Sequence, residues 1–254
     1  MDISKEELKL IIIDAITTAF CDMKLVRKGG THHFEKTYAT KTRVRNNPTH
    51  QEFIHTTRFS KLFRHALRPI LEPVRSKQLN MAFFSKVNSI IKTDQINQKG
   101  FRTPVHGNLH ELRNYDFNTK ASFKSIFYAF PKVTFYREEG KVQLQIPAFE
   151  LYNTIKPYKG ATHFRMVSSA IEMDFFNQQS SSSHLEGDYI DLQEKMAPDI
   201  SQIHQLPENS KHPQFLILAC QFFQLVNGIY YQLLNQANNA VEITAVDVVE
   251  NLEI

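Results

Sequence analysis

The sequence predicts an α+β fold, with a basic and mainly helical region over residues 1–110 and an antiparallel β-sandwich of fibronectin-like or immunoglobulin-like character over residues 111–254. Two patterns predict it. Apolar residues recur at helical spacing through the first hundred residues, whereas later segments alternate polar and apolar residues between turn signals. The 254 residues, 42% of them apolar, are enough to bury a sizeable core.

The first helix is expected over residues 4–20. Ser4 and Glu7 fit a capping box, in which the side chain of each residue accepts a hydrogen bond from the free backbone N–H of the other. Apolar residues from Leu8 to Phe20 then repeat at the spacing of one helix face.

Two further helices are expected, one from about residue 49 and one over residues 77–95. In the stretch RFSKLFRHALRPILEPVRSK, residues 58–77, Phe59 and Phe63 begin an apolar face at helical spacing, and basic residues fill the gaps. Pro69 and Pro73 predict a kink or an end there, because proline cannot continue the helical hydrogen bonding.

The later segments predict strands. Residues 132–136 and 141–146 alternate around a turn that contains Gly140, and residues 215–226 and 229–234 flank Asn227-Gly228, the strongest short hairpin signal in the chain. Residues 162–176 and 240–249 predict two more strands, and the last of these is a candidate sandwich edge for pairing with another copy. The serine-rich stretch NQQSSSSHLEGD predicts a polar loop.

Charge is distributed unevenly along the chain. Residues 24–130 carry 20 Lys/Arg and 6 Asp/Glu, whereas residues 131–254 carry 8 and 15, although the net charge of the whole chain is only +4. Such a split indicates two regions with different surroundings.

Several strings of residues carry a resemblance to a known family. They include TRVRNNPTHQEF at 42–53, SKLFRHALRP at 60–69, KTDQINQKGFR at 92–102 and GATHFRMVSSAIEMDF at 160–175. On these strings the chain resembles a family of hypothetical proteins of bacteria and their mobile elements, over nearly everything after residue 24. The resemblance implies a shared architecture, and no activity is established for that family.

The basic face of the second helix is the leading candidate site. Its residues are cations on or near one helix surface: Arg43, Arg45, Arg58, Lys61, Arg64, Arg68, Arg75 and Lys77. They could neutralise nucleic-acid phosphates, form the solvated side of an amphipathic helix, or dock on a protein surface such as the chain's own acidic half or an identical subunit. The sequence leaves these three alternatives open.

Metal and nucleophile chemistry is weakly signalled. His106 and His110 have i, i+4 spacing, but Pro104 and Gly107 argue against a helix there, so we expect no metal site. Ser180–Ser183 with His184 lack a nucleophile elbow and are interpreted as a flexible connector.

Acid–base and thiol chemistry is no better supported. Glu172 and Asp174 share a strand face, as a catalytic pair does, but alternating surface carboxylates are far commoner. The two cysteines, Cys21 and Cys220, have no CxxC spacing and are interpreted as small core residues of a reducing compartment.

The sequence therefore favours a non-enzymatic interaction or assembly protein that uses the basic helical face and a β-sandwich scaffold. The alternative is a sequence-nonspecific nucleic-acid-binding protein that uses the same helices. We expect no catalytic residues, cofactor or metal, a protein partner or self-association, no membrane contact, and a cytoplasmic location, because no stretch approaches the length of a membrane span and no secretory signal is found.

Overall fold

The structure is a computed structural model that describes residues 47–74, 76–118, 120–233 and 239–249, and the backbone of residues 23–28 and 31–36. The chain divides into two compact units, residues 1–46 and residues 47–254. In the first unit, β1 (Met23–Lys28) pairs with β2 (Thr31–Lys36) in antiparallel fashion. The helix predicted over residues 4–20 lies outside the described residues.

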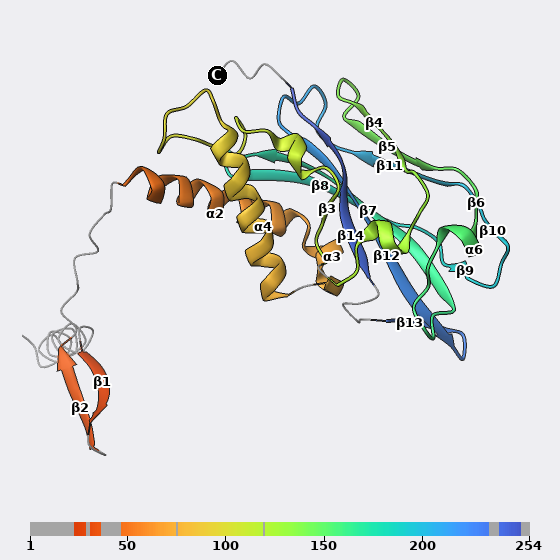
Figure 1. The fold of residues 1–254 in the computed structure, drawn as a ribbon, viewed down its shortest axis with the longest axis horizontal. Helices are drawn as coiled ribbons and strands as arrows, with labels where there is room; N and C mark the ends of the chain where they lie inside the picture. Colours follow the sequence, from red (N-terminus) through yellow and green to blue (C-terminus); the bar gives the residue numbers. More distant parts are fainter. Residues whose placement is uncertain are drawn as a thin grey trace, which may run out of the picture. The chain divides into compact units, whose positions relative to one another are not determined.

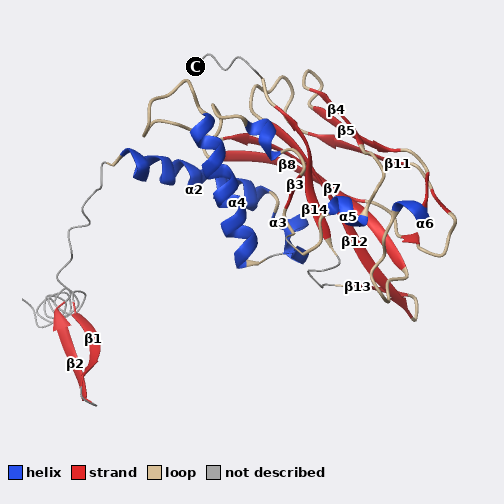
Figure 2. Cartoon of the chain, in the orientation of Figure 1, coloured by secondary structure: helices blue, strands red, loops and turns tan. Residues whose placement is uncertain are grey.

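The second unit begins with a helical layer. It contains α2 (Pro48–Ala66), α3 (Arg68–Leu71), a 3-10 turn (Glu72–Val74), α4 (Lys77–Ile90) and a second 3-10 turn (Ile91–Thr93). The side chain of Asn47 caps α2 by accepting from the backbone N–H of Thr49 at 3.1 Å, and the chain turns ahead of Pro69 as the sequence predicted. These helices stand together on one side of the long strands (Figure 2).

The central sheet is antiparallel, with the strand order β3-β14-β12-β7-β8. Its strands are β3 (Tyr115–Asp116), β14 (Ala240–Asp247), β12 (Gln214–Val226), β7 (His163–Asp174) and β8 (Gln179–Glu186). Two short strands extend it, β9 (Ile190–Asp191) beside β7 and β13 (Ile229–Gln232) beside β12. Asn227 and Gly228 both have positive φ, as the turn of the β12–β13 hairpin requires.

A three-stranded sheet lies on the other side, in the order β11-β5-β4 (Figure 1). Its strands are β4 (Lys132–Tyr136), β5 (Lys141–Ile146) and β11 (Ile200–Gln205). The connecting elements are a 3-10 turn (Leu109–Leu112), α5 (Phe123–Ile126), β6 (Phe149–Glu150), α6 (Leu151–Thr154) and β10 (Met196–Ala197).

Two cores share the long strands. On β12, Phe215 and Ile217 belong to a core with the helices, whereas Leu216 and Leu218 belong to a core with the three-stranded sheet. We call these the helix-facing core and the sheet-facing core. Because side chains alternate along a strand, a strand segment buried on both faces reads as an unbroken apolar run, and Phe215–Cys220 of β12 is such a run.

The predicted α+β class with antiparallel sheets is confirmed. Two details are wrong. The stretch predicted as a polar loop is largely β8, since serines with little apolar alternation can still satisfy a strand's backbone ladder with β7. The last strand, β14, is not a free edge, because it pairs with β12 on one side and with β3 on the other. The domain division at residue 110 stays a prediction, although the helices and the central sheet share the helix-facing core.

Candidate functional site: the basic helical face

Helix α2 separates an apolar face from a basic one. Phe59 and Phe63 are fully buried in the helix-facing core, where their rings lie 6.0 Å apart. Because α2 repeats every 3.6 residues, this packing turns the intervening cations away from the core. The apolar face of α2 is therefore buried by packing, and its basic face is available to other molecules.

The structure places four of the eight predicted cations on the surface. They are exposed, and among the described residues none of them forms a salt bridge: Arg58, Lys61, Arg68 and Lys77. Arg64 is half-buried instead. The other three predicted residues, Arg43, Arg45 and Arg75, lie outside the described residues.

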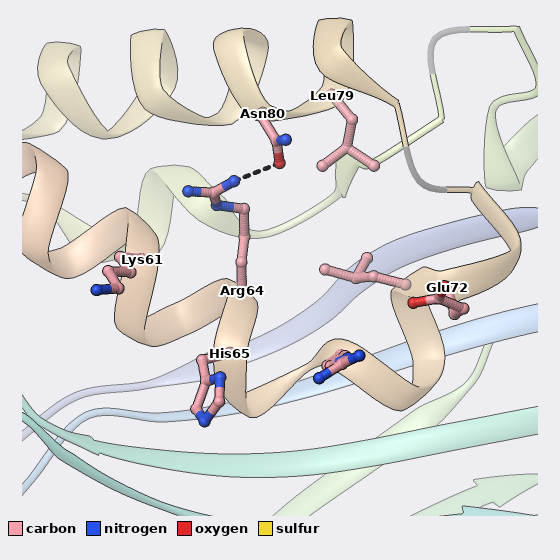
Figure 3. Close-up of a pocket in the computed structure, with 8 residues that line it drawn as sticks. Lys61, Arg64, His65, Glu72, Leu79 and Asn80 are labelled. Carbon is pink, nitrogen blue, oxygen red and sulfur yellow. Dashed lines mark hydrogen bonds between the residues drawn. The ribbon is translucent and has the colours of Figure 1, made fainter.

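Arg64 is held in place by hydrogen bonds. Its Nε donates to the backbone oxygen of Ser60 at 3.0 Å, and its guanidinium also donates to the side-chain oxygen of Asn80 on α4. The guanidinium therefore bridges the two helices and is positioned before any partner arrives (Figure 3).

A cavity of about 360 Å³ opens beside Arg64. Its walls come from α2, α3, the turn that follows and α4: Lys61, Arg64, His65, Arg68, Leu71, Glu72, Leu79 and Asn80. Figure 3 shows Arg64 reaching from α2 toward Asn80 on α4, with Leu79 near Asn80 and with His65 extending away from α4. With one carboxylate among its lining groups, the cavity is an electropositive recess suited to an anionic group.

The basic residues near the end of α2 also have a local structural role. Arg64 and His65 lie in the last turn of α2, where the backbone carbonyls carry partial negative charge. The solvated-face alternative is compatible with this placement. It does not account for the cavity, whose Asn80 and Leu79 come from a second helix.

Sequence reasoning missed His65, Leu79 and Asn80. His65 follows Lys61 by four residues, so helical spacing alone could have added it to the face. Leu79 and Asn80 belong to α4, and only the packing of α2 against α4 brings them to the cavity.

The residues considered for metal chemistry do not converge. His106 is half-buried and lies 2.8 Å from the amide nitrogen of Asn97, whereas His110 is exposed in the 3-10 turn at residues 109–112. Within the described part of the chain, no three His, Cys, Asp or Glu side chains gather in a metal-binding group.

The paired carboxylates on β7 are also separated in role. Glu172 is buried beside the amide nitrogen of Gln214, at 3.4 Å. Asp174 caps the following turn, where hydrogen bonds from Asn177 lower the pKa of the carboxyl against the opposing effect of burial. Cys220 is buried as predicted, burial raises the pKa of its thiol, and Cys21 lies outside the described residues.

A buried serine–histidine network lies between the sheets. His204 Nε2 lies 2.7 Å from Ser168 Oγ, and its Nδ1 lies 3.1 Å from Ser183 Oγ. Ser168 and His204 have no exposed surface, and burial lowers the pKa of His204 to about 4. Because Ser168 and His204 are closed to solvent in this structure, we assign the network to packing between β7, β8 and β11.

Comparison with known proteins adds no relative: no family model, no curated protein and no solved structure matches this chain. No helix among the described residues combines the length and the apolar character needed to cross a membrane.

Proposed function

We propose that the protein is a non-enzymatic interaction or assembly protein whose basic helical face binds an acidic partner. One observation carries the proposal: Arg58, Lys61, Arg68 and Lys77 are exposed and without salt bridges in the described structure. Elsewhere the same structure pairs Lys86 with Glu111 at 2.8 Å, and it pairs Arg137 with Asp247 and Arg165 with Glu186, each at 2.6 Å. An unneutralised basic surface attracts a partner of opposite charge.

The charge map indicates a protein partner. Residues 47–113 carry 11 Lys/Arg and 4 Asp/Glu, whereas residues 114–254 carry 10 and 16. A second copy of the chain therefore offers an acidic β region to the basic helices of the first. Contacts of this kind act mainly on encounter rate and orientation, and they weaken with salt.

The scaffold in this proposal is a β-sandwich. The two sheets pack on a shared sheet-facing core, to which β5, β7 and β12 all contribute. This layering supports a sandwich in which rigid sheets hold the helices. The resemblance to hypothetical proteins of bacteria and their mobile elements belongs to the same proposal.

The second candidate is sequence-nonspecific nucleic-acid binding, and the cavity favours it. Lys61, His65 and Arg68 surround a recess in which Arg64 is already positioned. A phosphate seated there would meet several donors at once, and each phosphate contact would release counterions.

Two measurements on the full chain test both candidates. Native mass spectrometry at low and high salt reports self-association, and fluorescence anisotropy reports binding to labelled polyglutamate, DNA and RNA. Each is made on the wild type, on an Arg58→Glu/Lys61→Glu/Arg68→Glu variant, and on a Lys156→Glu/Lys159→Glu/Lys211→Glu control, whose lysines are also exposed.

Salt-sensitive oligomers or polyglutamate binding, lost in the first variant and kept in the control, support the interaction proposal. DNA or RNA binding with a steep salt dependence and the same variant pattern supports the second candidate. The basic helical face is rejected as a site if the variant and the control lose binding equally, or if no probe binds the wild type at low salt.

A further inference from the structure

The β12–β13 hairpin exposes an apolar surface at the end of the central sheet. Its five large apolar side chains are between 37% and 56% exposed: Leu225, Val226, Ile229, Tyr230 and Tyr231. Figure 1 shows this hairpin at the end of the long strands, away from the helices. Val226, Ile229 and Tyr231 lie on one face of the hairpin, and Leu225 and Tyr230 lie on the other. Exposed apolar side chains clustered at one end of a sheet mark an interaction site more often than scattered apolar residues do.

The hairpin also lacks the charges that usually protect a strand edge. Residues 213–241 contain no Asp, Glu, Lys, Arg or His. Natural edge strands are guarded by charged side chains, proline or bulges, since an unguarded edge pairs with other chains. In the described residues β13 pairs with β12 alone, so its second edge carries no such guard.

The other outer strands are less accessible. β8 is the last strand on its side of the central sheet, but it contacts both α2 and β11. In the three-stranded sheet, β4 contacts β14 and begins with the charged Lys132. Of the outer strands β8, β4 and β13, only β13 packs against its own hairpin partner without a second main contact in the described structure.

The backbone of β13 presents hydrogen-bonding groups to that edge. The N–H of Leu233 donates to Phe222 on β12 at 2.9 Å, and successive residues of a strand direct their amide groups to opposite sides. The backbone N–H and C=O groups of Ile229 and Tyr231, like those of Leu233, therefore point toward β12. The N–H and C=O groups of Tyr230 and Gln232 point to the open edge.

Aromatic contacts hold the hairpin in a defined position. The ring of Tyr230 stacks on that of Tyr189, with centroids 3.9 Å apart and planes within 4°. Tyr189 in turn packs edge-on against Phe223, and the guanidinium of Arg165 lies 4.9 Å from the Phe223 ring. The edge is thus preformed, which lowers the entropy that a partner strand must overcome.

We propose that this hairpin is a self-association site, at which β13 of a second copy adds antiparallel to the open edge of the first. A two-fold axis at Tyr230 places each Tyr230 opposite its copy and each Ile229 opposite the other Tyr231, so that like faces of the sheet coincide. The site is independent of the basic helical face.

The charge pattern selects a second copy as the occupant. Two copies of an uncharged hairpin meet without repulsion, whereas the rest of residues 114–254 is acidic and repels its like. The surface area that the hairpin can bury is on the order of 500 Å² per copy, below the ~800 Å² that each partner buries in a standard interface. The dimer is therefore expected to be reversible. We expect dissociation at micromolar concentration.

Sedimentation velocity of the full chain, from about 1 to 300 μM, tests the proposal. The wild type is expected to shift from monomer to dimer, and the shift is expected to persist in high salt because the contact is apolar. An Ile229→Lys/Tyr231→Lys variant is expected to stay monomeric. A Phe130→Lys/Tyr152→Lys control, altered at two aromatic residues that are 90% and 95% exposed, is expected to dimerise like the wild type.

A Gln232→Pro variant separates strand pairing from general apolar adhesion, because it removes an open-edge donor and keeps the apolar side chains. It is also expected to stay monomeric, with a melting temperature that shows it is folded. A wild type that is monomeric at 300 μM overturns the proposal. A dimer that both hairpin variants retain also overturns it. A dimer that is lost only in the Arg58→Glu/Lys61→Glu/Arg68→Glu variant is formed by the basic helical face instead.

Discussion

The helix-facing core and the sheet-facing core share the same strands but differ in what they bury. The centre of the helix-facing core is aromatic, with the ring of Phe63 4.9 Å from Phe83 and 5.0 Å from Phe215. The space between the sheets also buries polar groups, among them His204 and Glu242. We therefore expect the aromatic cluster around Phe63 to supply stability that is independent of pH, and His204 and Glu242 to make stability depend on pH.

The largest effect is expected in the helix-facing core. Phe63→Ala removes a fully buried ring from a cluster of aromatic neighbours, and phenylalanine truncations of this kind cost about 4 kcal/mol. Urea unfolding at several pH values measures the loss, which is expected to be the same at each. Phe130→Ala, at a residue that is 90% exposed, is the control and is expected to change stability by less than about 0.5 kcal/mol.

Glu242 is expected to make the protein less stable as pH rises. Burial, with a smaller contribution from Asp116, raises the pKa of Glu242 to about 7, and its Oε2 accepts no hydrogen bond among the described residues. The folded state holds a proton that the unfolded state releases near pH 4.5, so stability is highest below that pH and falls through pH 7. Glu242→Gln is expected to raise the free energy of unfolding by about 3 kcal/mol at pH 8 and by little at pH 4.

His204 is expected to act in the opposite direction. Its pKa of about 4 in the folded protein lies below the ordinary 6.5, so the unfolded state binds the proton first as pH falls. The stabilisation is complete above pH 6.5 and is lost through pH 4, by about 3 kcal/mol.

Between pH 4.5 and 6.5 the contributions of Glu242 and His204 therefore have opposite slopes. His204→Gln is expected to leave a free energy of unfolding that declines with pH, and Glu242→Gln one that increases, as urea titrations at half-unit intervals would show. Parallel pH profiles in the two variants would contradict this division of roles.

The sequence predicted the helix-facing side of the molecule well. Apolar residues at helical spacing predicted α4 from Lys77, where the structure begins it, and Pro69 predicted the end of α2. The Asn227-Gly228 pair likewise predicted the β12–β13 hairpin. These features depend on residues that are close together in the chain, and local pattern is what a single sequence shows.

The features that were missed depend on residues far apart in the chain. His204 reaches Ser168 across 36 residues, and Arg64 reaches Asn80 across 16, between two separate helices. Strand β8 was missed for a different reason, because its serines show no apolar alternation and its pairing with β7 is carried by the backbone. Neither kind of information is present in local periodicity.

The smallest effect on stability is expected on the basic helical face. Arg58, Lys61 and Arg68 are exposed and form no salt bridges among the described residues, so Arg58→Glu/Lys61→Glu/Arg68→Glu is expected to cost less than about 1 kcal/mol. Arg64→Glu is expected to cost more, because it removes the hydrogen bonds to Ser60 and Asn80 from a half-buried site. Thermal unfolding of both variants measures the difference. If the triple variant is as stable as expected, a loss of binding in it reports a lost contact, because the helix-facing core that supports α2 is intact.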